Sequence, residues 1–343
     1  MKNLALIGAG YWGRNLARNF HQLGALAVVC DSSDEVLAAQ SAACPGIRVT
    51  ESVEEVLADT SIARVAIAAP AARHHELALR ALQAGKDVFV EKPLALDVRH
   101  AQELRDVAVR DGRILMVGHL LQYHPCFLAM RSMVRNGTLG ELQYLTSNRL
   151  NLGKIRREEN ALWSFAPHDL SVIISLVGNR LPIAVRCMGE SFLNRRVADV
   201  TLTAMRFEGG VDAHVFVSWM NPFKEQKLTV IGSEAMMVFD DTKPWQEKLR
   251  LFRQPIVWGD GDVPLASKSG GELVPVEESE PLHNECAHFL ECCNRRLAPR
   301  TDAEEGLRVL RVLQAAQCSL EAWGDVHHSH SELLKSEDLP PLR

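Results

Sequence analysis

The glycine-rich segment near the start of the sequence constrains the fold more than any other feature. A short apolar run, residues 4–7, leads into Gly8, Gly10 and Gly13 in a Gly-x-Gly-x-x-Gly pattern, and a second apolar run is followed by Asp31. The first glycine permits a tight turn, the second lets the backbone approach a diphosphate, and the third lets a helix pack closely on a sheet. The pattern therefore predicts a strand, a turn and a helix whose N-terminal amides bind a dinucleotide.

Asp31 indicates which dinucleotide is bound. At the tip of the second strand, its carboxylate can accept hydrogen bonds from both hydroxyls of an adenosine ribose. The next two residues, Ser32 and Ser33, offer no arginine that could compensate a 2′-phosphate. We therefore expect NAD as the cofactor, contacted also by Tyr11, Trp12 and Ser32.

Length, charge and cysteine spacing narrow the class of protein. The chain has 343 residues, which favours two domains, and its net charge of -5 gives no reason to expect a nucleic-acid partner. No apolar run approaches the ~20 residues that span a bilayer. The eight cysteines lack C-x-x-C spacing. We expect reduced thiols, no metal site, no membrane partner and a cytoplasmic location.

The pattern of apolar residues divides the chain into two parts. Residues 1–120 alternate apolar runs with amphipathic segments, which predicts an α/β Rossmann domain with a doubly wound parallel sheet. Within it, Asp97 is expected to cap a helix that ends before Gly112. Residues 121–343 predict a second α/β domain with an open, mostly antiparallel sheet. Its expected strands cover residues 140–150, 183–193, 197–207, 211–219 and 226–239.

Lys92 is the first candidate for chemistry. It follows an apolar run that ends in Glu91, and it precedes Pro93. Ligands of open α/β sheets bind beyond the carboxyl ends of the strands, so we expect Lys92 beside the cofactor. Burial and a cationic nicotinamide ring both disfavour a charged lysine, which suits proton exchange with a substrate hydroxyl. A surface lysine at a strand end is the alternative.

These motifs together resemble a known family, the Gfo/Idh/MocA dehydrogenases, over nearly the whole chain. The motifs are GAGYWG at residues 8–13, Ala68-Ala69-Pro70-x-x-x-His74, Ala81-Leu82-x-Ala84-Gly85-Lys86-x-Val88, Glu91-Lys92-Pro93-Leu94, Val117-Gly118-His119 and Tyr123-His124-Pro125. The resemblance implies that Lys92 is catalytic and that the Lys92-Pro93 bond is often cis. It also implies cofactor contacts from Ala69, Pro70, His74, Glu91, Lys92 and Gln122.

The same resemblance implies the second half of the active site. Family members carry an Asp-x-x-x-His motif after the crossover, and the corresponding residues here are Ser164 and His168. His168 is expected to exchange a proton with the substrate hydroxyl, with Lys92 as the other catalytic residue. A serine can orient a hydroxyl but cannot share a proton load, so Ser164 departs from the family pattern. We expect a helix over residues 166–177 to close the site; a buried structural histidine is the alternative.

A basic loop precedes this helix and indicates which class of substrate the site binds. Residues 149–157 carry four cations, and guanidinium and ammonium groups suit phosphate oxygens. The loop resembles that of a family branch which oxidises carbon 3 of nucleotide-linked amino sugars. The resemblance implies UDP-N-acetylglucosamine or a close UDP-amino sugar, whose 3-keto product is transaminated for lipopolysaccharide or lipid A. A solvated or intersubunit loop is the alternative. The expected substrate contacts are Lys92, His124, Arg149, Asn151, Lys154, Arg156, Trp163, Ser164 and His168.

Two other functions stay open at this point. The chain could be an inositol or free-sugar dehydrogenase of the same family, or a catalytically weak dinucleotide-sensing protein, for which Ser164 is the only hint. We also expect a homotetramer. Val215, Val217 and Trp219 alternate along one expected strand and need covering, and members of the family pair these sheets face to face.

Overall fold

The chain forms two compact units. The computed structural model describes residues 2–153, 155–157, 159–193, 197–253, 257–258, 264–265, 270–322 and 327–328. The first unit comprises the residues up to Tyr123 together with Ser279–Leu310, and the second comprises His124–Glu278 together with the described residues from Arg311 onward.

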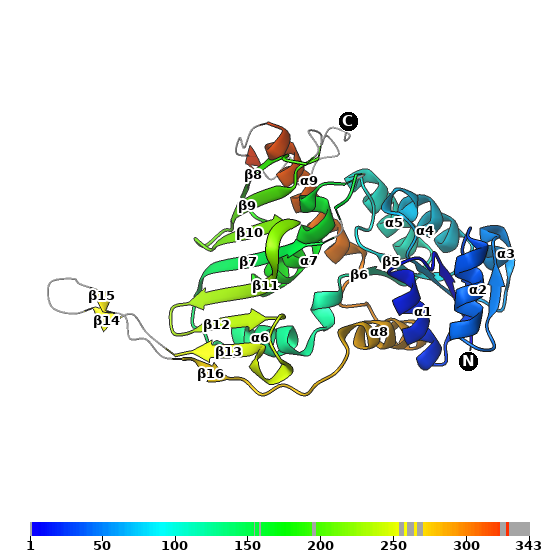
Figure 1. Ribbon diagram of the computed structural model, residues 1–343, viewed down its shortest axis with the longest axis horizontal. Coiled ribbons are helices and arrows are strands. Elements are labelled where there is room, and N and C mark those ends of the chain that lie inside the picture. Colours follow the sequence, from blue (N-terminus) through cyan, green and yellow to red (C-terminus); the bar gives the residue numbers. More distant parts are fainter. Residues whose placement is uncertain are drawn as a thin grey trace. The chain divides into compact units, whose positions relative to one another are not determined.

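The first unit is built on a six-stranded parallel sheet with the order β3-β2-β1-β4-β5-β6 (Figure 1). This is the doubly wound order of a Rossmann fold, so the predicted fold class is confirmed. The strands are β1 (Leu4–Ile7), β2 (Leu26–Cys30), β3 (Arg48–Thr50), β4 (Arg64–Ile67), β5 (Asp87–Glu91) and β6 (Leu115–Gly118). The helices are α1 (Gly13–Gln22), α2 (Asp34–Ala43), α3 (Val53–Ala58), α4 (His74–Gln83) and α5 (Val98–Arg110), with short 3-10 helices η1 (Ala71–Arg73) and η2 (Leu120–Tyr123).

Short-range side-chain contacts fix the ends of these helices. Asp97 Oδ1 accepts a hydrogen bond from Arg99 N at 2.7 Å and so caps α5. Gly112 follows the end of that helix with a φ of +60°. Ser33 caps α2 in the same way, because its Oγ accepts from Val36 N. The predicted start and stop of the helix after Asp97 are therefore confirmed.

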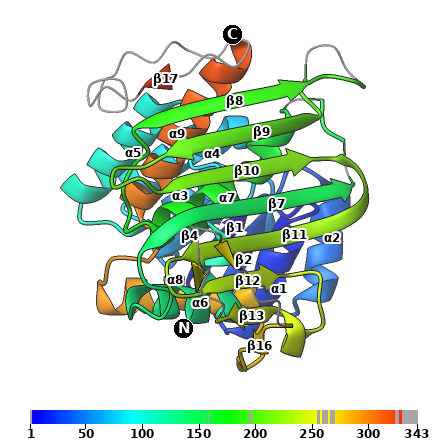
Figure 2. The same cartoon turned by 90° about the vertical axis from the view of Figure 1, so that its left-hand side faces the viewer.

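The second unit is built on a nine-stranded sheet with the order β16-β13-β12-β11-β7-β10-β9-β8-β17 (Figure 2). β7 pairs in parallel with β10, and the other neighbouring strands of this sheet are antiparallel. The prediction of a mostly antiparallel sheet is confirmed. The strands are β7 (Leu142–Leu152), β8 (Ala184–Glu190), β9 (Val200–Arg206), β10 (Asp212–Ser218), β11 (Met220–Gly232), β12 (Met236–Asp240), β13 (Leu249–Phe252), β16 (Glu272–Leu273) and β17 (His327–His328). β14 (Val257–Trp258) and β15 (Pro264–Leu265) pair with each other, and η3 spans Trp245–Glu247.

One predicted strand of this sheet is wrong. The run 226–239 is two strands, because the chain turns between Gly232 and Met236. At Gly232 an added Cβ would lie 2.0 Å from the backbone oxygen of Leu139, so the chain passes another segment there at very close range. The backbone N–H of Ser233 then donates to Glu141, away from the β11–β12 ladder.

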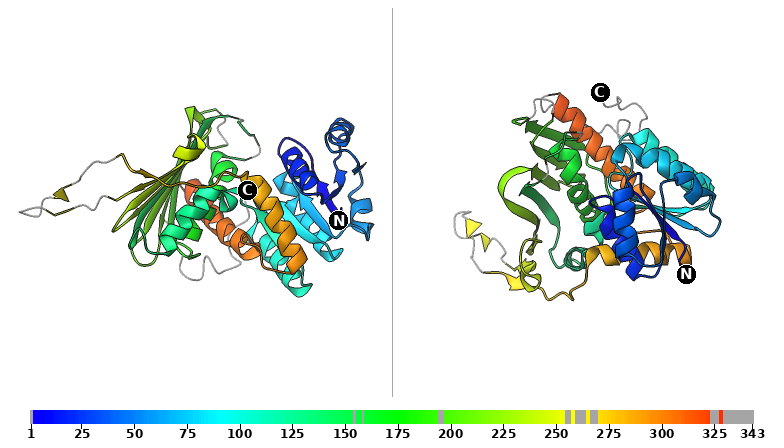
Figure 3. Two further views of the ribbon diagram at one scale, coloured as in Figure 1. Left: turned by 90° about the horizontal axis from the view of Figure 1, so that it is seen from below. Right: turned by 45° about the vertical axis from the view of Figure 1, so that its right-hand side comes forward.

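α7 (Ala161–Leu176) and α6 (Pro125–Arg135) lie on one face of the second sheet (Figure 3). The predicted start of this helix at residue 166 is wrong. Asn160 caps the helix earlier, because its Oδ1 accepts a hydrogen bond from Trp163 N at 3.1 Å. Pro167 consequently lies inside α7.

The residues expected to form an uncovered apolar face are covered within the unit. Val215, Val217 and Trp219 are each 0% exposed, and α7 packs against the strand that carries Val215 and Val217. The prediction that these three side chains need a partner is therefore wrong. Met188 on β8 and Leu202 on β9, which lie directly opposite each other, are 49% and 38% exposed.

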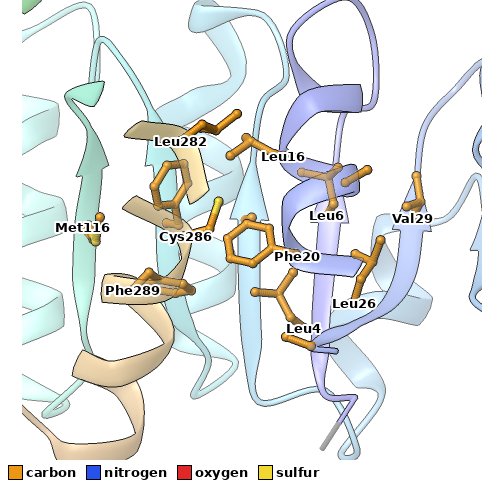
Figure 4. Packing of buried hydrophobic residues seen from close by; sticks show 14 of the residues in the cluster. Leu4, Leu6, Leu16, Phe20, Leu26, Val29, Met116, Leu282, Cys286 and Phe289 are labelled. Carbon is orange, nitrogen blue, oxygen red and sulfur yellow. The ribbon is translucent and has the colours of Figure 1, made fainter. Parts of the chain in front are cut away.

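α8 (Pro281–Arg295) completes the core of the first unit, although it follows the second sheet in the sequence. It packs on α1, and Figure 4 shows Phe289 of α8 beside Phe20 of α1. The rings of Phe20, Phe89 and Phe289 meet edge to face, with centroids 5.8–6.3 Å apart. Residues 281–295 were expected in the second domain but belong to the first unit. The amphipathic pattern of a helix predicts that one face is buried, but it does not reveal which core receives that face. α9 (Ala303–Glu321) then contains the boundary between the units.

Neither a membrane span nor a metal cluster occurs in the described ranges. None of the helices there combines the length and the apolar character that crossing a bilayer requires. No group of three or more His, Cys, Asp or Glu side chains in the same ranges could hold a metal ion.

Candidate active site

The glycine-rich turn has the geometry that a dinucleotide requires. Gly8 has a φ of +85°, and an added Cβ would lie 2.7 Å from Ala69 N. A Cβ at Gly13 would lie 2.1 Å from Gly8 O, whereas nothing described lies within 4 Å of the position of a Cβ at Gly10. Close packing therefore requires glycine at residues 8 and 13, whereas Gly10 faces open space. No described side chain caps the N-terminus of α1, and its first turn carries no acid, so its amides can receive a diphosphate.

Asp31 is oriented by backbone amides at the end of β2. Ala9 N donates to Oδ2 at 2.7 Å and Ser33 N donates to Oδ1 at 3.1 Å. Each oxygen keeps a further lone pair for a ribose hydroxyl. Ser32 beside it is exposed. The glycine turn and Asp31 thus fit the dinucleotide that the sequence predicts.

His74 is placed to hold two loops together. It is 2% exposed, and its ring nitrogens lie 2.7 Å from Pro93 O and 2.8 Å from Ala69 O. It therefore connects the end of β4 to the turn after β5, and its contact with the cofactor stays a prediction. Pro70 is exposed and Ala69 partly so.

Glu91 and Lys92 form the turn after β5, where the Lys92-Pro93 peptide bond is cis. The Glu91 carboxylate is buried; its Oε1 accepts from Trp12 Nε1 at 2.5 Å and its Oε2 from Lys92 N at 3.3 Å. Burial raises the pKa of Glu91 to about 7, although the hydrogen bond from Trp12 and the charge of Lys92 oppose the rise. Lys92 itself is partly exposed. The Glu91 carboxylate thus accepts hydrogen bonds from within the protein and connects Trp12 to the turn at Lys92.

The end of β6 contributes buried polar groups to the same unit. His119 Nδ1 lies 2.6 Å from Glu305 Oε2, and both side chains are buried. Gln122 in η2 is 2% exposed, and its backbone carbonyl accepts a hydrogen bond from Arg300 at 2.8 Å. The predicted contact of Gln122 with the cofactor stays a prediction.

In the second unit, Ser164 and His168 lie one turn apart on α7, which puts them on the same side of the helix. Ser164 is buried, and His168 is partly exposed. Trp163, predicted to bind substrate, is 5% exposed, and its Nε1 donates to Gln317 Oε1 at 3.0 Å. Its place in the interior indicates a packing role at the start of the helix.

Asp169, which the sequence analysis left out of the site, fixes Arg149. The Arg149 guanidinium donates to both carboxylate oxygens of Asp169, at 2.7 and 3.2 Å, and Ser147 Oγ donates to Oδ1 at 2.6 Å. Arg149 on β7 is therefore paired with Asp169 on α7, which packs against β7. Ser147 and Arg149 are two residues apart on β7, which is the one sequence signal of a shared face.

His124 is held inside the second unit. Its Nδ1 accepts from Cys126 N at 3.1 Å and its Nε2 lies 3.4 Å from Asp241 Oδ1, with the ring stacked on Trp245. Burial favours a higher pKa for Asp241, but His124 and Lys248 outweigh it and lower that pKa to about 2. His124 is 3% exposed, and its contact with substrate stays a prediction.

The basic loop after β7 is only partly described. Asn151 is partly exposed and Arg156 is exposed, and Arg156 Nη1 lies 2.8 Å from Glu159 Oε1. Lys154 lies outside the described residues. Arg157 is exposed as well.

Comparisons with known proteins agree with this geometry. The sequence matches a profile described as "Oxidoreductase family, NAD-binding Rossmann fold" over residues 2–119 and the GFO/IDH/MocA C-terminal domain over residues 127–238. It is similar to UDP-N-acetylglucosamine 3-dehydrogenase of Acidithiobacillus ferrooxidans, with 26% identity over 93% of this chain and 97% of the relative. It is also similar to an NADP(+)-dependent scyllo-inositol 2-dehydrogenase of Bacillus subtilis, with 22% identity over 79% of this chain and 80% of that protein. A solved structure of the Acidithiobacillus ferrooxidans enzyme superimposes with a TM-score of 0.82 at 24% identity, over 94% of this chain and 98% of that one.

Proposed function

Because the chain belongs to the Gfo/Idh/MocA family of NAD(P)-dependent oxidoreductases, we propose that it oxidises the 3-hydroxyl of UDP-N-acetylglucosamine, or of a close UDP-amino sugar, with NAD. One observation carries the choice of substrate. The similarity to UDP-N-acetylglucosamine 3-dehydrogenase extends over 97% of that enzyme, both domains included. The 3-keto product would then enter a transamination towards lipopolysaccharide or lipid A.

The proposed chemistry divides between the two units. NAD, when bound, accepts the hydride from carbon 3. As the carbon–oxygen double bond forms, the hydroxyl proton leaves, and Lys92 and His168 exchange that proton. Lys92 stands at the carboxyl end of β5, where ligands of parallel sheets bind, and His168 is partly exposed on α7. Ser164, which replaces the acid common in the family, orients the hydroxyl at most.

The substrate is tested by turnover. The chain is incubated with NAD and, separately, UDP-N-acetylglucosamine, free N-acetylglucosamine or scyllo-inositol, and NADH formation is followed by absorbance. We expect the highest kcat/KM with the UDP-sugar. Equal or better turnover of scyllo-inositol would favour the polyol dehydrogenase to which the chain is also similar.

The proton-exchanging residues are tested by substitution. A positioned acid or base contributes about 10²–10⁴-fold to the rate, so Lys92→Ala and His168→Ala should each lower kcat by that factor and leave NADH binding nearly unchanged. Ser164→Ala should lower kcat by less than about tenfold, because a neutral hydroxyl there contributes one hydrogen bond. Near-normal turnover in the first two variants would place the proton route elsewhere.

A further inference from the structure

Three buried acids and one imidazole meet in the interior of the first unit. Glu91 ends β5, Glu285 lies on α8 and Glu305 lies on α9, and they are 8%, 0% and 4% exposed. His119 pairs with Glu305. Neither oxygen of Glu285 has a hydrogen-bond partner among the described residues. Buried carboxyl groups without partners are rare in folded proteins, which makes their arrangement informative.

We propose that Glu91 is a positioning residue for the dinucleotide, which in its ionised form holds Trp12 of the glycine-rich turn against the backbone of the Lys92 turn. The carboxylate contacts both segments directly. Oε1 and Oε2 face N–H donors from two different segments, and a Cβ on Gly118 of the adjacent strand would lie 3.0 Å from the same carboxyl group. The glycine at residue 118 therefore leaves the space that the Glu91 carboxyl group fills.

Protonation of Glu91 would weaken this connection. Protonation removes the negative charge to which Trp12 Nε1 and Lys92 N donate. Hydrogen bonds to an ionised carboxylate are also stronger than those to a neutral acid. Trp12 directly precedes Gly13, the first residue of α1. Weakening the hydrogen bond of its indole would therefore make the glycine-rich turn, whose amides receive the diphosphate, less well ordered.

The groups around Glu91 determine when it ionises. Lys92 and His119 favour the charged carboxylate, while burial disfavours it, and the pKa of Glu91 is raised to about 7. Glu285 packs from α8, where burial and then the charges of Glu91 and Glu305 raise its pKa well above the ordinary value. The raised pKa of Glu285 favours its neutral form beside Glu91.

The experiment measures the Kd of NADH from pH 6 to pH 8.5, without any sugar substrate. In the parent protein we expect binding to weaken about tenfold from the high to the low end, since one charge-assisted hydrogen bond is lost. Glu91→Gln places an amide N–H where Glu91 accepts one, so its binding should stay at the weak, low-pH level throughout. Trp12→Phe removes the indole donor, and its Kd should depend less on pH than that of the parent.

Two further variants make the test specific. Glu285→Gln keeps a neutral group of the same shape and should retain the parental pH profile. In the double variant Trp12→Phe with Glu91→Gln, the fold-increase in the Kd of NADH should be smaller than the product of the fold-increases in the two single variants, because both changes break the same contact.

The proposal is overturned if Glu91→Gln keeps the parental pH dependence, if the two losses multiply, or if Glu285→Gln flattens the profile. The proposal about Glu91 concerns binding of the dinucleotide and is independent of the identity of the sugar substrate. Lack of turnover with UDP-N-acetylglucosamine would contradict the proposed function and leave this inference in place, whereas a parent chain that fails to bind NADH would contradict this inference directly.

Discussion

At the scale of single residues, the carboxylate of Asp31 cannot turn away from a ligand, because Ala9 N and Ser33 N each hold one of its oxygens. A 2′-phosphate on the adenosine ribose would meet that fixed charge. Two like charges ~4 Å apart near a protein surface repel by roughly 1–4 kcal/mol, so we expect NADH to bind at least about tenfold more tightly than NADPH. Titration of the two cofactors measures the preference. Asp31→Ser should narrow it, and equal binding by the parent would contradict the prediction.

The buried carboxyl group of Glu285 leads to a prediction about how the folding free energy depends on pH. Its pKa is raised well above the ordinary 4.5, first by burial and then by the charges of Glu91 and Glu305. Above pH 4.5 the unfolded chain releases this proton and the folded chain keeps it, so the group costs about 1.4 kcal/mol of folding free energy per pH unit, up to the folded pKa. Glu285→Gln removes that cost.

The measurement is urea unfolding of the parent and of Glu285→Gln between pH 5 and pH 8. The variant should gain stability over the parent as the pH rises. Glu277→Gln is the matched control, because the Glu277 side chain is exposed in the folded protein. A stability difference that stays constant with pH would mean that Glu285 is ionised in the folded state.

Sequence reasoning predicts residues whose partners are near in the chain and misses those whose partners are distant. Gly8, Gly13 and Asp97 were predictable because each role depends on a few neighbouring residues. The pairing of Arg149 with Asp169, twenty residues later on another element, was not predicted. Trp163 is bonded to Gln317 at a separation of 154 residues, which no local pattern can reveal.

At the scale of elements, the loop between β7 and α7 carries the proposed diphosphate contact. Arg156→Ala should raise the KM for the UDP-sugar about ten- to hundredfold, with little change in kcat, because binding far from the reacting carbon stabilises ground and transition states alike. Glu159 is paired with Arg156 and competes with a phosphate for it, so Glu159→Gln should lower the KM.

Steady-state kinetics with the UDP-sugar and with free N-acetylglucosamine check this loop. Turnover of the free sugar, which lacks phosphates, should be poor and should not suffer further from Arg156→Ala. Arg206→Ala is the matched control, since Arg206 is also an exposed arginine paired with an acid, Asp212. A fall in kcat equal to the change in kcat/KM would instead place Arg156 at the reacting centre.

Element types were more predictable than element limits. The alternation of apolar runs with amphipathic segments predicted the parallel sheet, because strands buried on both faces lack polar positions. The start of α7 was placed too late, since Pro167 is typical of a first turn and Asn160 is an equally good cap. The pairing of β7 with β10 depends on contacts between residues about 70 apart, so no local signal defined it.

At the scale of the whole molecule, we predict a homotetramer in solution, because apolar side chains other than Val215, Val217 and Trp219 are exposed on the second sheet. Met188 and Leu202 are cross-strand neighbours, and Leu152 and Met220 pair in the same sheet, with all four exposed. Burying such apolar pairs against a second copy is favourable. Light scattering should therefore give a particle about four times the chain mass of 38.1 kDa.

Leu202→Glu combined with Met188→Glu should reduce the particle size. Val109→Glu is the control, because Val109 is an exposed apolar side chain on α5 of the first unit. A parent particle of 38.1 kDa at working concentration would contradict the assembly.

The placement of α8 on α1 also fixes an order of events during synthesis. Phe20 emerges from the ribosome early, whereas Phe289 emerges 269 residues later. At roughly 5–20 residues per second, the apolar side of α1 therefore waits on the order of 13–54 s for the helix that covers it. Throughout that time the nascent first unit exposes Phe20, and it becomes complete only when nearly the whole chain has been translated. Ribosome-bound chains that end before α8 are consequently the species in which a chaperone would find this face uncovered.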